Sequence, residues 1–247
     1  MNLKEFKSLK EQTTTYLINY EHFNKSSNLL DLKYYHYFGK TISKILYLRN
    51  DNDLMFGIAN LYQEGKLEEL DNLVNEQRKK YTAESIELNK KIVKADSVIG
   101  SNVSQEDIDK LNESFDEVIS KYHPALTMSV NQNERQSYEM LKNLFYDNNI
   151  LGYFSYYDLC IKSFKNADEN IDYDRVGAFY QKTIYDIRAY VVENQEKYPY
   201  NFKEMFEDEM LIAKHQGDLD VEYSRLVEEN NALHKDITNL LKKEIKL

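Results

Sequence analysis

The chain has 247 residues, of which 42% are hydrophobic and 30% are charged, and its formal net charge is -10. This hydrophobic content is enough for a packed core, which excludes disorder as the state of the whole chain. The negative charge opposes binding to phosphate backbones and anionic lipid surfaces, so we expect neither a nucleic-acid partner nor a membrane partner.

Glycine and proline are scarce, with seven and two residues respectively. Because both residues disfavour helix interiors, their scarcity predicts an all-α protein with long helices. The single cysteine, Cys160, lies in an apolar run, and we expect a buried, unreactive thiol in a reducing compartment. We find no apolar signal-peptide core and no uncharged apolar run of membrane-spanning length, so we expect a cytoplasmic protein.

Residues 1–63 have a helical but irregular hydrophobic pattern. Polar residues at 26–28, Gly39 and a polar run at 50–53 interrupt it. Because glycine and short polar residues favour helix ends over helix interiors, we predict several shorter N-terminal helices in this segment.

Residues 66–100 are predicted to form one long coiled-coil helix. Its seam positions follow the Glu64-Gly65 break at helical spacing, and all but Gln77 are apolar or aromatic: Leu67, Leu70, Val74, Gln77, Tyr81, Leu88, Ile92, Ala95 and Ile99. Such a narrow seam leaves most of the helix polar, so we expect the seam to pack against a partner helix.

Residues 104–166 are predicted to form a helical unit in which two helices flank a loop. Ser104 and Asp107 have the spacing of a helix N-cap, and the first helix must end before Pro124. Asn131 or Asn133 caps the second helix. The unit therefore places His123 and Pro124 at the turn between two helices, with a further apolar helix after it at about 151–164.

Residues 170–247 are predicted to contain a helix at 173–194, a turn at Pro199 and a final helix from about residue 203. Leucines recur every seventh residue in the final helix, at Leu219, Leu226, Leu233, Leu240 and Leu247. In one geometry this seam forms a parallel homodimer whose register is set by Asn230. In the other it folds back on the 173–194 helix as an antiparallel hairpin, which we favour because that helix offers a matching seam. The segment 203–209 is acidic, which excludes a basic-zipper DNA reader.

The sequence contains no recognisable catalytic, cofactor-binding or metal-binding motif. None of the five histidines has a glutamate three positions before it, as the di-iron sites of helical bundles require. Zinc-protease motifs, phosphate-binding glycine loops, nucleophile elbows and paired cysteines are also missing. We therefore predict a protein that is not an enzyme. A helical enzyme or ligand-binding bundle would require carboxylates or histidines that converge in a pocket.

The segment LNESFDEVISKYHPAL at 111–126 resembles the second helix and loop of the J domain, the module that activates the ATPase of seventy-kilodalton heat-shock chaperones. The order of parts more closely resembles a group of J-like coiled-coil proteins, of uncharacterised function, from low-GC Gram-positive bacteria. The shared features are the long helix before Ser104, the His123-Pro124 turn and the segment KYPYNFKEMFEDE at 197–209. The resemblance implies an elongated all-α protein with long antiparallel coiled-coil arms, a small J-like hairpin and a chaperone as partner.

Two departures from the J domain weaken that implication. J domains carry an aspartate after His-Pro, where this chain has Ala125. The helix before the loop is acidic, whereas active J domains present a basic face there. We therefore predict a non-enzymatic interaction or scaffold protein with a degenerate J-like module and no stimulation of chaperone ATPase. In that module His123 and Pro124 either contact a partner protein or only terminate a helix. The alternative is a weak co-chaperone that delivers a client protein.

Overall fold

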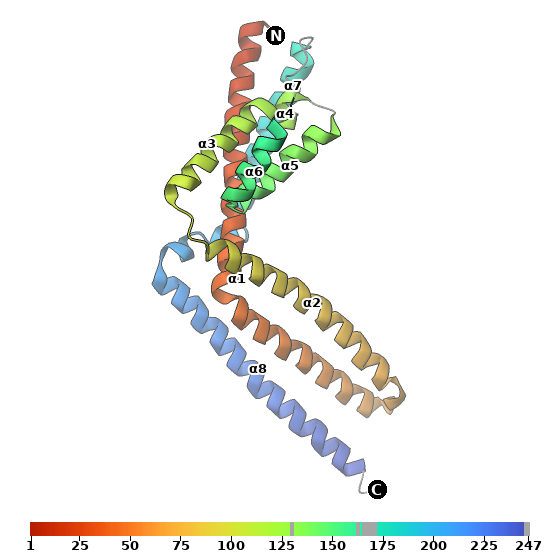
Figure 1. The fold of residues 1–247 in the computed structure, drawn as a ribbon. Coiled ribbons are helices and arrows are strands. Elements are labelled where there is room, and N and C mark those ends of the chain that lie inside the picture. Colours follow the sequence, from red (N-terminus) through yellow and green to blue (C-terminus); the bar gives the residue numbers. More distant parts are fainter. Residues whose placement is uncertain (129–130, 162–163, 165–171, 245–247) are drawn as a thin grey trace. The chain divides into compact units, whose positions relative to one another are not determined.

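A computed structural model of the chain describes residues 1–128, 131–161, 164 and 172–244 (Figure 1). These residues contain helices and connecting turns but no strand, which confirms the all-α prediction. The helices are α1 (Leu3–Glu64), α2 (Leu70–Ile99), α3 (Gln105–Tyr122), α4 (Pro124–Thr127), α5 (Gln132–Tyr146), α6 (Ile150–Cys160), α7 (Tyr173–Asn194) and α8 (Glu209–Glu244). Short 3-10 turns occupy Leu67–Glu69, Tyr200–Phe202 and Glu204–Glu207. No described helix combines the length and the apolar character that a membrane span requires.

The N-terminal segment is one uninterrupted helix, α1, of 62 residues. The prediction of several shorter helices is therefore wrong. Tertiary contacts stabilise the helix at positions where we predicted breaks. Asn28 donates from Nδ2 to the carbonyl oxygen of Tyr146 at 2.9 Å. Gly39 lies against Ile92, whose Cγ1 would be 2.6 Å from an added Cβ, so the missing side chain lets another helix approach closely.

The contacts group the chain into two compact units, and each unit is discontinuous in sequence. Unit 1 contains Met1–Asp31 and Val98–Lys203, and unit 2 contains Leu32–Ser97 and Glu204–Leu247. The first half of α1 thus belongs to unit 1 and its second half to unit 2. This grouping differs from the four consecutive segments, 1–63, 66–100, 104–166 and 170–247, that the sequence suggests. Residues 166, 170 and 247 themselves lie outside the described part of the chain.

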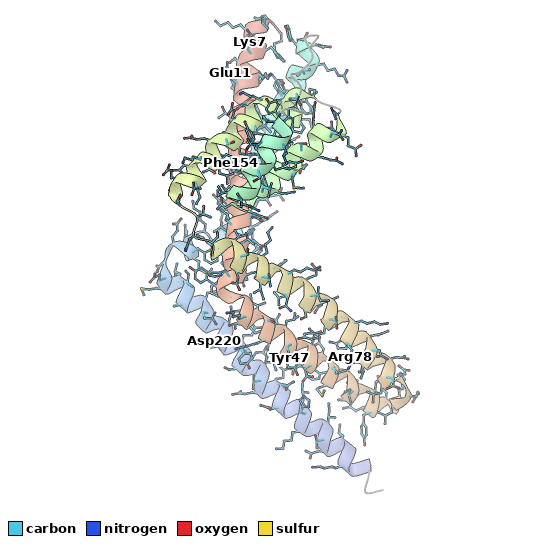
Figure 2. The ribbon with its side chains drawn as sticks, viewed as in Figure 1. Lys7, Glu11, Tyr47, Arg78, Phe154 and Asp220 are labelled. Atoms are coloured by element: carbon cyan, nitrogen blue, oxygen red, sulfur yellow. The ribbon has the colours of Figure 1, made fainter. Side chains whose placement is uncertain are left out.

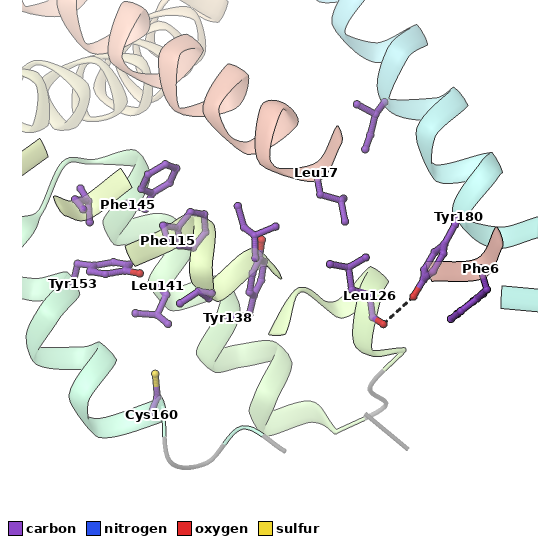
Figure 3. Close-up of a cluster of buried hydrophobic side chains, with 14 residues drawn as sticks. Phe6, Leu17, Phe115, Leu126, Tyr138, Leu141, Phe145, Tyr153, Cys160 and Tyr180 are labelled. Atoms are coloured by element: carbon purple, nitrogen blue, oxygen red, sulfur yellow. Dashed lines mark hydrogen bonds between the residues drawn. The ribbon is translucent and has the colours of Figure 1, made fainter. Parts of the chain in front are cut away.

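Unit 1 gathers α3, α4, α5, α6 and α7 around the first half of α1. The predicted caps are confirmed: the Ser104 hydroxyl accepts the Asp107 N–H at 3.1 Å, and the Asn131 side chain accepts the Asn133 N–H at 3.0 Å. Apolar residues of all these elements form one core, shown in Figure 3. Its side chains include Phe6, Leu17, Leu111, Phe115, Val118, Ile119, Leu126, Tyr138, Leu141, Phe145, Tyr153, Cys160, Tyr180 and Ile187.

The Cys160 thiol lies in this core, as predicted, and it is a free cysteine. Burial raises the pKa of the thiol, which keeps the sulfur protonated and poorly nucleophilic at neutral pH. Helix α7 runs beside α1 in the same direction: Arg188 Nε donates to the Tyr16 hydroxyl at 2.8 Å, and the Tyr198 hydroxyl, beyond the end of α7, donates to Asp31 at 2.6 Å.

Unit 2 is a layer in which the second half of α1 lies between α2 and α8 (Figure 1). Helix α2 runs antiparallel to α1, since His36 pairs with Asp96 near one end and Lys80 pairs with Asp53 near the other. Seam residues of α2 face α1, with Ile92 against Gly39 and the Gln77 side chain donating to the Asn50 carbonyl oxygen at 3.1 Å. Figure 2 shows the side chains carried by the three helices.

Helix α8 runs parallel to the second half of α1. Gln216 donates to Thr41 at 2.9 Å, and Asn230 donates to Asp51 at 2.6 Å. Leu226 is buried and belongs to a small cluster with two residues of α1. The α7–α8 hairpin that we favoured is therefore wrong, because α7 packs on the first half of α1 within unit 1 and α8 packs on its second half within unit 2.

Candidate functional site

The His123 loop is the strongest candidate site in the sequence, and its local structure explains its shape. His123 ends α3, and Pro124 occupies the first turn of α4, where its missing N–H costs no hydrogen bond. The His123 Nδ1 atom accepts the backbone N–H of Ala125 at 3.0 Å, so the imidazole acts as the N-cap of α4. This bond places the ring proton on Nε2.

The Nε2 atom of His123 points into the protein, toward a buried carboxylate on α1. It lies 3.6 Å from Oε1 of Glu21, and the two side chains are only 12% and 4% exposed. The imidazole also meets the ring of Tyr138 edge to face, with 5.0 Å between the ring centroids. The histidine is therefore a packed, polar element of unit 1.

Glu21 collects donors from two further positions, both on α5. The Tyr138 hydroxyl donates to Glu21 Oε1 at 3.3 Å, and the Tyr146 hydroxyl donates to Oε2. Burial by itself raises the pKa of Glu21, but the contacts with His123 and Tyr146 outweigh burial and hold the pKa below its ordinary value. Glu21 is thus a carboxylate at neutral pH, buried and surrounded by donors.

The two tyrosines keep their protons. Burial, together with the negative charge of Glu21, raises the pKa of Tyr138 well above its ordinary value and raises the pKa of Tyr146 as well. Both hydroxyls therefore act as hydrogen-bond donors across the physiological pH range. We name the set Glu21, His123, Tyr138 and Tyr146 the Glu21 cluster.

A second polar set lies one turn farther along α1. The Lys25 ammonium donates to Asn112 of α3 at 2.7 Å and lies 4.2 Å from the centre of the Phe145 ring. Burial lowers the pKa of Lys25 to about 8, although the nearby charge of Asp116 acts in the opposite direction. Asp116 itself pairs with His22 at 2.7 Å. These contacts fasten α3 to α1.

The arrangement is closed rather than open to a substrate. The Glu21 carboxylate is occupied by neighbouring side chains of the chain itself, and Lys25 is itself buried against Phe145. Within the part of the chain that the structure describes, no three His, Cys, Asp or Glu side chains converge as a metal site would require. The buried polar groups therefore act on orientation: they fix where α3, the His123 loop and α5 meet α1.

Asn230, predicted to set the register of a dimer, lies elsewhere, in unit 2. Its side chain donates to Asp51 at 2.6 Å and to Asn52 at 2.8 Å, both on α1 of the same chain. Asn230 therefore fixes the alignment of α8 along α1.

Glu21 and Lys25 were missed by the sequence reasoning. Both lie on a long, mixed helix whose charged residues are otherwise mostly exposed, and their spacing of four residues is common in solvated helices. Only the approach of α3 and α5 distinguishes them from their neighbours.

Comparisons with protein-family models, curated proteins and solved structures find no match to this chain.

Proposed function

We propose that this protein is a non-enzymatic helical interaction protein in which the J-like loop serves the fold and does not stimulate the ATPase of a seventy-kilodalton chaperone. One observation carries the proposal. His123 uses Nδ1 to cap α4 and directs Nε2 at the buried Glu21 carboxylate. Both ring nitrogens are thereby engaged inside unit 1, so neither is free to bond to a partner protein.

The charges of α3 support the same proposal. A partner helix or loop that binds an acidic chaperone surface needs exposed cations. In α3, Lys110 pairs with Glu106 at 2.7 Å, and Lys121 pairs with Glu117. Both lysines are thus partly neutralised by carboxylates one turn away on the same helix.

The first experiment measures ATP turnover by the seventy-kilodalton chaperone of the same cell, with and without the purified protein. A J-domain co-chaperone known to act on that chaperone is the positive control. We expect no change in turnover from this protein, and none from Ala125→Asp, because the loop aspartate alone leaves α3 acidic. A clear rise that His123→Gln abolishes would overturn the proposal in favour of a co-chaperone.

The second experiment compares the proteins captured from host-cell extract by wild type and by His123→Gln. We expect the same partners for both. Since His123→Gln weakens a helix cap, its circular dichroism and thermal unfolding are measured first, so that lost capture is not confused with lost folding. Capture of the chaperone by wild type alone, with the variant folded, would contradict a purely structural role of the loop.

A further inference from the structure

Four amide side chains meet in unit 2, within one turn of α1. Asn230 of α8 donates to the Asn52 side chain at 2.8 Å, and Gln77 of α2 donates to the Asn50 side chain at 3.1 Å. Asn50 and Asn52 are only 6% and 4% exposed. The α1–α8 contact and the α1–α2 contact therefore each contain one amide pair. We name Asn50, Asn52, Gln77 and Asn230 the amide layer.

The seam of α8 is apolar or aromatic at every other position. It reads Leu219, Tyr223, Leu226, Asn230, Leu233, Ile237 and Leu240. Leu226 packs with Ile45 and Leu48 of α1, and Asn52 continues the same face of α1 at a spacing of four residues. Because the leucines repeat every seven residues, they match α1 almost equally well after a shift of one heptad. The leucines alone therefore do not select one alignment.

The amide pair distinguishes the observed alignment from the shifted one. If α8 moved by one heptad, Ile237 or Tyr223 would lie opposite Asn52, and neither side chain pairs with a carboxamide as Asn230 does. In the first case Asn230 would enter the cluster of Ile45 and Leu48, where Tyr223 now packs. A buried amide without a partner disfavours such an alignment by about tenfold or more.

The antiparallel contact between α1 and α2 has the same form. The pair of Asn50 and Gln77 lies between two apolar contacts, in which Ile92 meets Gly39 and Leu73 meets Gly57. A sliding movement of α2 would move Gln77 away from Asn50 and toward these apolar contacts. Both neighbours of α1 are thus aligned by the same short stretch of that helix.

The amide layer is not the arrangement that gives the greatest stability. Nδ2 of Asn52 is buried and has no hydrogen-bond partner among the residues that the structure describes. Two apolar side chains in place of Asn52 and Asn230 would leave no such group, and Asp51 would keep its contact with His234 at 2.9 Å.

We propose that the amide layer is a register lock, which holds α2 and α8 in one alignment along α1 at some cost in stability. A single buried asparagine selects the alignment of helices in coiled coils by the same means. The inference goes beyond the proposed function, because it concerns which of several alignments unit 2 adopts.

The test introduces Asn52→Leu together with Asn230→Leu into two cysteine reporters, with the native cysteine replaced by alanine. Thr41→Cys with Gln216→Cys reports the observed alignment, since the wild-type side chains lie 2.9 Å apart. Thr41→Cys with Tyr223→Cys reports the shifted one, because residue 223 lies about 10 Å farther along α8, beyond the reach of a disulfide.

Without the leucines, we expect mild oxidation to give an intrachain disulfide only in the first reporter. The leucine pair should increase the disulfide yield of the shifted reporter by about tenfold or more. In the otherwise wild-type chain it should also raise the melting temperature. Asn230→Leu alone should lower the melting temperature, because the buried Asn52 side chain then loses its only hydrogen-bonding partner among the described residues.

The matched control is Asn231→Leu, which changes the neighbouring, exposed asparagine of α8. We expect it to leave the shifted reporter at the wild-type yield. The proposal is overturned by an unchanged shifted reporter in the leucine pair, by equal yields for the pair and the control, or by a leucine pair that melts below wild type. None of these results bears on chaperone turnover, so failure here is distinguishable from failure of the proposed function.

Discussion

The two units use the same secondary structure in different ways. Unit 1 surrounds its part of α1 with five helices and has a core of many fully buried side chains, whereas the described part of unit 2 buries fewer apolar residues, namely Leu32, Phe38, Ile45, Leu48, Ala95 and Leu226. Unit 2 is a layer of three helices, so each helix contributes a narrow stripe to contacts and exposes the rest. Helical sequences of similar polarity thus give either a thick core or a thin layer, depending on how many neighbours each helix has.

The polar contacts differ in the same way. Unit 1 buries charged groups, with Glu21 3% and Lys25 5% exposed. In unit 2, interhelical pairs such as His36 with Asp96 and Arg49 with Glu222 remain partly exposed to water. Because water weakens exposed pairs, we expect single substitutions to act more strongly in unit 1 than in unit 2.

The largest expected effect is that of Phe115→Ala. Phe115 is fully buried in unit 1 and stacks on Phe145 with ring centroids 4.2 Å apart. The cavity should lower the free energy of unfolding by about 3–5 kcal/mol, measured by denaturant titration. Hydrogen exchange should rise in α3, α5 and α6. The matched change in unit 2, Leu226→Ala, should have a smaller effect, since a thin layer can relax around it. An equal or larger effect of Leu226→Ala would refute the contrast between the units.

The next effect is that of Glu21→Gln, which keeps the shape of the side chain and removes its charge. Tyr138, Tyr146 and His123 would then face a neutral amide, and we expect unfolding to become easier by about 1–3 kcal/mol. Glu117→Gln is the control, because Glu117 pairs with Lys121 at an exposed position where little stability is at stake. Similar melting temperatures for the two variants would show that the charge of Glu21 contributes no more to stability than that of an exposed carboxylate.

A smaller effect concerns pH and Lys25. Its pKa is about 8 in the folded protein against 10.5 ordinarily, so between these values the unfolded chain binds more protons than the folded one. Stability from this group therefore rises as pH increases, by about 1–2 kcal/mol from pH 7.5 to 9.5. Lys25→Met should remove this rise, whereas Lys110→Met at an exposed position should retain it. Parallel pH profiles for wild type and Lys25→Met, from chemical denaturation, would contradict the burial argument.

The smallest effect belongs to unit 2. Gly217 lies within α8, and a Cβ at that position would meet nothing within 4 Å. Gly217→Ala should therefore stabilise the protein by about 0.5–1 kcal/mol, through helix propensity alone. Gly39→Ala offers the same gain in propensity but forces the new Cβ against Ile92. Thermal unfolding should rank Gly217→Ala above wild type and above Gly39→Ala, and the reverse order would mean that α1 and α2 are loosely packed.

Much of the local structure could be predicted from the sequence. The helical character, the caps at Ser104 and Asn131, the end of α3 before Pro124 and the bounds of α7 all follow from signals within a few residues. The apolar seam of α2 was also read correctly, since its periodicity does not depend on which helix covers it. Breaks in α1 were predicted wrongly, because polar residues such as Asn28 are stabilised there by contacts far away in the sequence.

The candidate site could be predicted only in part. The sequence located His123 at a helix end, but it carried no signal that Glu21, 3.6 Å away, was its neighbour. In the sequence of a charged helix, a carboxylate that becomes buried cannot be told from the exposed ones, because its burial depends on another element that covers it.

The sequence by itself determined that this chain forms long helices, where most of them begin and end, and which stripe of each is apolar. Those properties depend on local backbone preferences and on the helical repeat. The tertiary structure alone decided that α1 continues through both units, that α7 packs beside the first half of α1 and α8 beside its second half, and that His123 faces Glu21. Each helix has an apolar stripe that could pack against more than one other helix. Burial and hydrogen bonding, summed over residues distant in sequence, decide which stripes pack together.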